Sequence, residues 1–119
     1  MWDYAGRMEL MRRFWDAAVA LDPEAAELDE GRRFTICAPD PLRDLLEAAE
    51  LEQVDVRPID VPTVFRDFDD LWSPFLGGNA PAPAYAASLE PERLAALRER
   101  LRGSLPIEPD GSIPLVARA

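Results

Sequence analysis

Residues 7–21 place apolar side chains on two adjacent stripes of a helix. The stripes are Met8, Met11, Trp15 and Ala18, and beside them Leu10, Phe14, Ala17 and Leu21. Because these positions recur at intervals of three and four residues, the pattern predicts a helix. A surface helix on a small domain usually shows a single stripe, so two stripes predict burial on two sides. We therefore expect this helix to need more surrounding protein than the chain offers.

A second helix is predicted in the middle of the chain, after an acidic loop. Residues 22–34 are acidic and typical of a loop, with a short helical turn at 23–28. Asp40 is a good N-cap and Pro41 fits the first helical position. The apolar positions that continue this helix are Leu42, Leu45, Leu46 and Ala49.

Residues 54–65 alternate apolar and polar side chains, which predicts a strand. Pro58 and Pro62 lie inside it, and proline cannot donate a hydrogen bond to a neighbouring strand. This strand is therefore expected at a sheet edge or with bulges.

Two more helices and a short strand are predicted in the last third. Asp67 opens a helix whose apolar face is Phe68, Leu71, Trp72, Phe75 and Leu76 and which ends at Gly77-Gly78. Residues 77–87 are predicted to be a loop, and Ser88 is predicted to cap a fourth helix that extends to about Arg102. Asp110-Gly111 predicts a turn before a strand at Ile113 to Ala117.

Composition and charge narrow the classes of function. The chain has 119 residues, which is one domain at most. Its net charge of −10 argues against a nucleic acid partner, because phosphate binding needs clustered cations. With no His and one Cys, the chain has no internal disulfide and no Ser-His-Asp catalysis. The chain has no apolar stretch of membrane-spanning length and no start like a signal peptide, so we expect no membrane partner and a cytoplasmic location.

Four segments of the chain carry a resemblance to a known family. They are Trp2-Asp3-Tyr4-Ala5-Gly6 with MELMRRFWDAA, then FTICAPDPLRDLLEAAELEQVDVRPIDVPTVF, FRDFDDLWSPFLGGNAPAP and GSIPLVARA. Together they resemble the C-terminal half of a class I S-adenosylmethionine-dependent methyltransferase of the small-molecule, type 11 group. The resemblance implies a single partial domain over residues 1–119, the C-terminal part of a Rossmann-like α/β fold (α+β as an isolated fragment).

The resemblance also assigns individual strands. An antiparallel pair over 54–65 and 111–118 would be accompanied by about four helices. Trp2-Asp3 would end the fifth strand of the family's sheet, residues 41–61 would form a helix that continues into the sixth strand, and residues 111–118 would form the seventh.

Two features depart from the family's pattern. The turn before the sixth strand, usually Ala-Gly-Leu, is here Ala49-Glu50-Leu51. Glu50 can take the left-handed conformation of a helix end only at a cost of about 1 kcal/mol. None of the six glycines forms a Gly-x-Gly turn between a strand and a helix, so no residue is assigned to the methyl donor. S-adenosylmethionine is the family's cofactor, and none is expected for this chain alone.

Candidate pocket residues are the aromatic side chains of the last third and the two residues at the implied strand end. They are Trp2, Asp3, Phe68, Trp72, Phe75 and Tyr85. Aromatic side chains at helical spacing are more often core, and Tyr85 is the best candidate for a polar contact because it lies in the predicted loop. For Trp2 and Asp3, the alternative to a site at a strand's carboxyl end is a frayed chain terminus.

Two further groups have structural explanations. Asp67, Asp69 and Asp70 could hold Mg²⁺ or Ca²⁺, but their spacing fits helix capping better. Cys37 lies in an apolar context and is expected to be a buried small hydrophobe.

Two functions fit these observations. The first is the acceptor-side segment of a small-molecule methyltransferase, completed by a missing N-terminal half and inactive alone. The alternative is a non-catalytic binding or assembly module that forms a homodimer through residues 8–21 and a free sheet edge. A small-molecule acceptor is a possible ligand in both cases.

Overall fold

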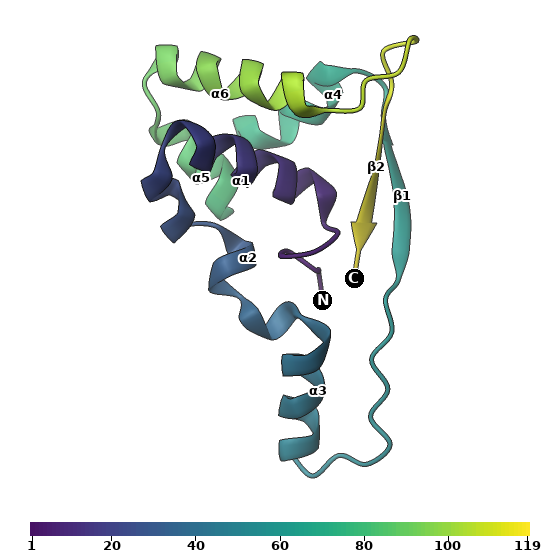
Figure 1. The fold of residues 1–119 in the computed structure, drawn as a ribbon. Coiled ribbons are helices and arrows are strands. Elements are labelled where there is room, and N and C mark those ends of the chain that lie inside the picture. Colours follow the sequence, from purple (N-terminus) through teal and green to yellow (C-terminus); the bar gives the residue numbers. More distant parts are fainter.

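The computed structural model describes residues 1–119 and contains six α helices and one two-stranded antiparallel sheet (Figure 1). The mixed α and β composition is confirmed, with six helices in place of the expected four. In chain order the elements are α1 (Glu9–Leu21), the 3-10 helix η1 (Pro23–Glu27), α2 (Glu30–Arg33), η2 (Thr35–Cys37), α3 (Pro39–Ala48), β1 (Asp60–Phe65), α4 (Phe68–Trp72), η3 (Ser73–Leu76), α5 (Pro81–Ser88), α6 (Pro91–Ser104) and β2 (Ile113–Arg118). None of the helices has the length and apolar character needed to cross a bilayer.

The sheet is an antiparallel pair of strands that are separated in the chain by the helices α4, η3, α5 and α6. The register runs from Asp60 opposite Arg118 to Phe65 opposite Ile113. Since the sheet has two strands, β1 lies at an edge, as the proline at position 62 predicts.

The strand predicted over 54–65 is too long at its start. Ile59 and Ala119 extend the pairing with two mutual N–H···O bonds of 2.8 and 2.9 Å. Residues 54–58 form no backbone hydrogen bond, because the element beside them is the helix α3 and not a strand.

The strand predicted over 111–118 begins at Ile113 instead. Asp110 and Gly111 form the predicted turn, with Gly111 at a φ of 88°. The Asp110 carboxylate accepts bonds from the N–H and the hydroxyl of Ser112, at 2.9 and 2.6 Å, which holds the chain in the turn.

The core is built from aromatic side chains of α1, α4, η3 and α5. Phe14 and Trp15 are fully buried, and the ring of Phe14 stacks on that of Phe75 with centroids 4.4 Å apart. α1 packs against α5, α6, β2 and η1. The predicted two-sided burial of this helix is confirmed. Within this chain the middle of both stripes is buried, whereas Met8, Leu10 and Met11 at the start of the helix are half-buried and Leu21 at its end is exposed.

The stretch 77–87, predicted to be a loop, contains the helix α5 from Pro81 onward. Pro81 and Pro83 both lie in its first turn. Backbone N–H groups there have no partner within the helix, so the prolines lose no hydrogen bond and can begin the helix instead of breaking it. Ser88 consequently ends α5, and α6 begins after Glu90.

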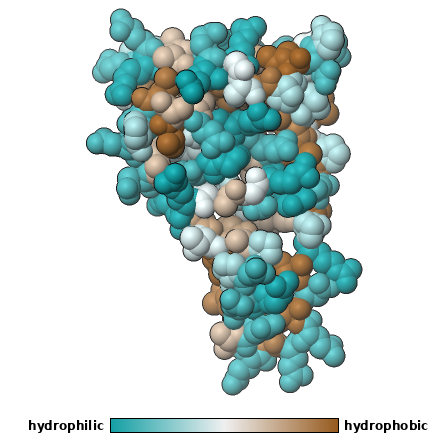
Figure 2. Space-filling view, viewed as in Figure 1, coloured by the Kyte–Doolittle hydropathy of each residue, from teal (hydrophilic) through white to brown (hydrophobic).

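α3 projects away from the other helices, and an extended segment returns alongside it to β1 (Figure 1). We call residues 39–59 the lobe and the remaining residues the body. No lobe residue is buried, although α3 forms close to where the sequence predicts it, with Pro39 in place of Pro41 in the first position. Figure 2 shows brown, hydrophobic atoms on the surface of this lower part of the molecule.

The lobe makes the molecule less compact than a chain of this length usually is. The radius of gyration is 16.0 Å, against about 13.5 Å expected for 119 residues. The accessible surface is 7478 Å², about 1,000 Å² more than the roughly 6,500 Å² expected for this mass.

The end of α3 adopts the left-handed turn that glycine usually provides. Glu50 has a φ of 62°. The N–H of Glu50 bonds to the carbonyl of Glu47 at 3.0 Å, and that of Leu51 bonds to Leu46 at 3.2 Å. These two bonds define a Schellman motif, formed here without its usual glycine.

Candidate functional site

The four aromatic candidates of the last third lie in the core of the body. Between 3% and 8% of the surface of each side chain is exposed in Phe68, Trp72, Phe75 and Tyr85. Tyr85 lies in α5 and not in a loop, and its hydroxyl donates to the Asp22 carboxylate at 3.3 Å. The crevice beside Tyr85 has a volume of about 20 Å³, which is room for a single water molecule and not for a substrate.

A groove lies instead between the lobe and the chain termini. It has a volume of about 410 Å³, within the range of ligand-binding clefts. Of the two candidates at the start of the chain, Asp3 lines the groove. Trp2 is not among the lining residues and has 42% of its surface exposed.

One wall of the groove is a face of α3. Leu42 and Leu46 line it one helical turn apart, whereas Leu45 points elsewhere and is 55% exposed. Pro39 begins this wall and Cys37 precedes it, half-buried rather than buried as predicted. This wall is apolar because positions i and i+4 of a helix share one face.

The opposite wall is the extended segment from Asp55 to Ile59, and Met1, Asp3, Arg118 and Ala119 close the end of the groove. Val56 and Ile59 add apolar surface to this wall, and Asp55 and Arg57 add charged groups. Val56 is half-buried, whereas Ile59 is 64% exposed.

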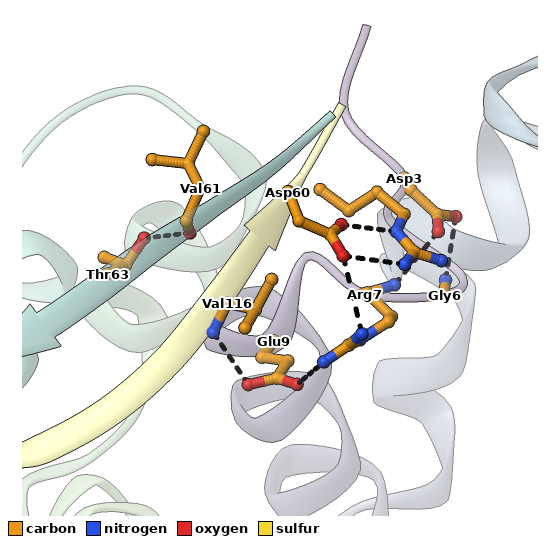
Figure 3. Close-up of polar contacts among 9 residues, drawn as sticks. Asp3, Gly6, Arg7, Glu9, Asp60, Val61, Thr63 and Val116 are labelled. Atoms are coloured by element: carbon orange, nitrogen blue, oxygen red, sulfur yellow. Dashed lines mark hydrogen bonds and ion pairs between the residues drawn. The ribbon is translucent and has the colours of Figure 1, made fainter. Parts of the chain in front are cut away.

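A network of ion pairs holds the closed end. Arg118 donates two bonds to the Asp60 carboxylate, from Nε at 2.6 Å and from Nη2 at 2.8 Å. Arg7 reaches the same carboxylate at 3.5 Å and Glu9 at 3.4 Å (Figure 3). The bonds from Arg118 lower the pKa of Asp60 below its usual value, and Asp60 raises the pKa of the Arg118 guanidinium.

The N-terminal segment covers the free edge of β2. The Asp3 N–H donates to the carbonyl of Arg118 at 2.9 Å, and the Arg118 N–H donates to that of Arg7 at 3.1 Å. The Val116 N–H donates to the Glu9 carboxylate at 2.8 Å (Figure 3).

Asp3 is also tied down by its side chain. Its carboxylate accepts bonds from the N–H groups of Gly6 and Arg7, both at 3.0 Å (Figure 3). A Cβ on Gly6 would lie 2.1 Å from a carboxylate oxygen of Asp3, so any other residue at this position would displace that carboxylate. The start of the chain is therefore folded onto the sheet, and the Asp3 carboxylate is committed to a turn.

A buried pair of acidic residues was not anticipated from the sequence. Asp29 and Glu30 are 3% and 4% exposed. Arg12 bonds to both oxygens of Asp29, at 3.2 and 2.6 Å, and the Trp15 indole N–H donates to Glu30. Burial raises the pKa of Glu30, against the lowering effect of the bond from Trp15. The sequence offered one signal for this arrangement, an Asp at position 29 that could cap a helix. The Asp29 carboxylate does cap α2, because it accepts a bond from the N–H of Gly31.

The acidic cluster of α4 serves as a helix start. The Asp67 carboxylate accepts from the Asp70 N–H at 2.8 Å, while Asp70 pairs with Arg66 and Asp69 with Arg98. No group of three His, Cys, Asp or Glu side chains is placed to hold a metal ion. The capping interpretation of this cluster is thus the one that the contacts favour.

No family model, curated protein or solved structure matches the chain. The groove has apolar walls and charged groups that are engaged in ion pairs or in a turn, and it contains no nucleophile hydrogen-bonded to a base. Such a site suits the burial of apolar surface better than acid–base chemistry.

Proposed function

We propose that the chain is the acceptor-side segment of a class I, small-molecule methyltransferase fold and does not transfer methyl groups by itself. The observation that carries the proposal is the order of three segments. Residues 2–3, which the resemblance assigns to the end of the fifth strand, lie beside β2, and β2 pairs with β1. The segments assigned to strands five, seven and six are thus neighbours in space.

The helix end before β1 also supports the proposal. The left-handed turn at Glu50 stands where the family usually has glycine, and it forms in spite of the side chain. The two backbone bonds of the Schellman motif offset the steric cost at Glu50, as expected of a turn at the position where the family has glycine.

The residues present do not fit the family's methyl donor. Gly6 and Gly111 lie in turns, Gly31 and Gly103 lie in helices, and Gly77 and Gly78 lie between η3 and α5. None of them forms a strand–turn–helix cradle for a nucleotide. The donor would have to be held by another polypeptide segment, and this chain would contribute Trp2 and Asp3 near the acceptor.

The test has two parts. The coding sequence on both sides of this segment is read for a strand, a glycine-rich turn and a helix, and any such half is produced together with this chain. S-adenosylmethionine is then titrated calorimetrically into the chain alone and into the combined protein. Binding by the combined protein only is expected. Donor binding by the chain alone, or a flanking sequence without such a half, would contradict the proposal.

A second candidate is a self-associating, non-catalytic module. The surface excess of about 1,000 Å² is close to what one partner buries in a standard interface, about 800 Å². Light scattering tests this candidate directly. A dimeric mass at micromolar concentration would support it, and a monomer would exclude it.

A further inference from the structure

Between η1 and α4 the chain buries only two residues, Asp29 and Glu30. They lie at the start of α2, which stands between α1 and the lobe (Figure 1). Two parts of a fold are usually joined by buried apolar side chains, and acidic side chains are rarely buried. Because two carboxylic acids make the connection here, its strength depends on their protonation.

The partners of this acidic pair lie on α1, about one turn apart. Arg12 donates to both oxygens of Asp29, and the indole N–H of Trp15 donates to Glu30. Arg12 also donates to the carbonyl of Tyr4 at 3.2 Å, so the same side chain joins α2 to the N-terminal segment. We call these four side chains, those of Arg12, Trp15, Asp29 and Glu30, the latch.

Gly31 allows α2 to approach α1 this closely. A Cβ at position 31 would lie 2.5 Å from Nη1 of Arg12 and 3.0 Å from the carbonyl oxygen of Tyr4. A larger residue would therefore displace the guanidinium from Asp29. Since α2 has four residues, it is too short to be stable as a helix without such contacts.

The latch contains two acids and one cation. Arg12 forms its ion pair with Asp29, whereas the Glu30 carboxyl receives a bond from the neutral indole of Trp15. The other ionisable groups around the latch come from the N-terminal segment, α1, α2 and η2, and they are Tyr4, Asp16, Arg33 and Cys37.

Ionisation of Glu30 works against the closed latch. It would place a second negative charge beside Asp29, without a buried cation of its own and almost without access to water. Burial accordingly raises the pKa of Glu30. The closed latch is therefore most stable below the pKa of a free carboxyl, and it loses stability as the pH rises through the raised pKa. Burial also raises the pKa of Tyr4, so this phenol stays neutral in that interval.

We propose that Asp29 and Glu30 form a pH-sensitive latch that fixes the lobe to the body, and that ionisation of Glu30 loosens it. The lobe follows α2 and η2 directly, and no lobe residue is buried, so no core of its own fixes its position. Rising pH thus frees the lobe to move while the body stays folded. The proposal concerns contacts within the chain and is independent of the proposed function.

Deuterium exchange of the indole N–H groups, followed by NMR on the whole chain, tests the latch. Trp15 is fully buried with its N–H on Glu30, so its exchange requires the latch to open. Trp72, buried in α4, is the internal reference. The exchange rate of Trp15 relative to that of Trp72 is expected to rise at least about threefold from about pH 4.5 to about pH 7.5.

Three variants identify the group responsible. Glu30→Gln keeps an oxygen for Trp15 but cannot ionise, so the rate ratio should stay constant within about 1.5-fold. The matched control Glu27→Gln, an exposed acid in η1, should keep the native rise. Gly31→Ala should raise the ratio at least about threefold already at about pH 4.5, because it displaces Arg12. A native ratio that does not change with pH, or a rise that persists in Glu30→Gln, would overturn the proposal.

The distance between two spin labels tests whether the lobe moves. The labels are attached at Leu45→Cys in the lobe and Arg100→Cys in α6, in a Cys37→Ser background that should leave the exchange of Trp15 unchanged. The spread of distances is expected to widen about twofold from about pH 4.5 to about pH 7.5, and to stay constant when Glu30→Gln is added. A constant spread in a chain whose Trp15 exchanges faster at high pH would overturn the proposal, because the open latch would leave the lobe in place.

Discussion

The body and the lobe use similar apolar residues with opposite results. In the body, α1 buries Phe14, Trp15, Ala17 and Ala18 against four other elements. In the lobe, α3 has a comparable stripe of leucines and buries none of them. An amphipathic pattern is sufficient to form a helix, but a stable position for the helix depends on an opposing surface.

The same contrast holds for polar groups. In the body, Asp29 and Glu30 are buried and every buried side-chain polar atom has a partner. In the lobe, the backbone of residues 54–58 depends on water for its hydrogen bonds. The body thus satisfies its buried polar groups within the chain, whereas the lobe leaves backbone groups open to solvent.

Phe14→Ala provides the largest contrast in stability. The variant removes a fully buried ring that stacks on Phe75, so the free energy of unfolding should fall by about 3–5 kcal/mol. Leu45→Ala in the lobe should change it by less than about 0.5 kcal/mol. Urea unfolding followed by tryptophan fluorescence measures both. If Phe14→Ala does not fold, Phe14→Leu gives the milder comparison. Equal losses at the two sites would contradict the distinction between body and lobe.

Arg12→Met tests whether the buried polar cluster belongs to the body's stability. The substitution keeps the aliphatic stem but leaves Asp29 buried without its cation, which should cost about 3 kcal/mol. Adding Asp29→Asn removes the stranded charge while leaving an oxygen for the Gly31 N–H, so at least about half of the loss should be recovered. A double variant no more stable than Arg12→Met would contradict the ion-pair explanation.

Most of the local structure of the body could be predicted from the sequence. The spacing in residues 7–21 predicted α1, Asp67 predicted the start of α4, and Asp110-Gly111 predicted the turn before β2. Each depends on residues within a few positions of one another. α5 was missed because Pro81 and Pro83 resemble loop residues unless the helix start is already located.

The features that were missed in the lobe depend on distant parts of the chain. The length of β1 is limited by where β2 offers a partner, which no pattern within residues 54–65 reveals. The groove requires α3, residues 55–59 and both termini at once. Aromatic spacing indicated a pocket at Trp72 and Phe75, but it could not distinguish a pocket lining from a core.

Glu30→Gln separates the body's response to pH from that of the surface. Because burial raises the pKa of Glu30, its carboxyl holds a proton more tightly in the folded state than in the unfolded one. Its stabilising contribution is full below the unfolded pKa and is lost as the pH rises through the folded pKa. The stability of Glu30→Gln relative to the native chain should therefore increase between about pH 4 and about pH 7.

Urea unfolding at several pH values measures this difference. The Asp60→Asn variant is the control, because bonds from Arg118 lower the pKa of Asp60 and give the opposite sign. Its stability relative to the native chain should decrease as the pH rises to about 5 and then remain level. A flat difference for Glu30→Gln would show that the carboxyl titrates alike in both states.

Glu50→Gly should have the smallest effect, and that effect should be confined to the lobe. Glycine adopts the φ of 62° without a steric penalty, so the end of α3 should be stabilised by up to about 1 kcal/mol. Because α3 is not packed against the body, global unfolding should scarcely change, whereas the amides of Glu50 and Leu51 should exchange about fivefold more slowly. Glu52→Gly, next to the turn but without a positive φ, should bring no slowing, because glycine there only makes the unfolded chain more flexible. An equal rise in global stability for Glu50→Gly would mean that the lobe and the body unfold as one unit.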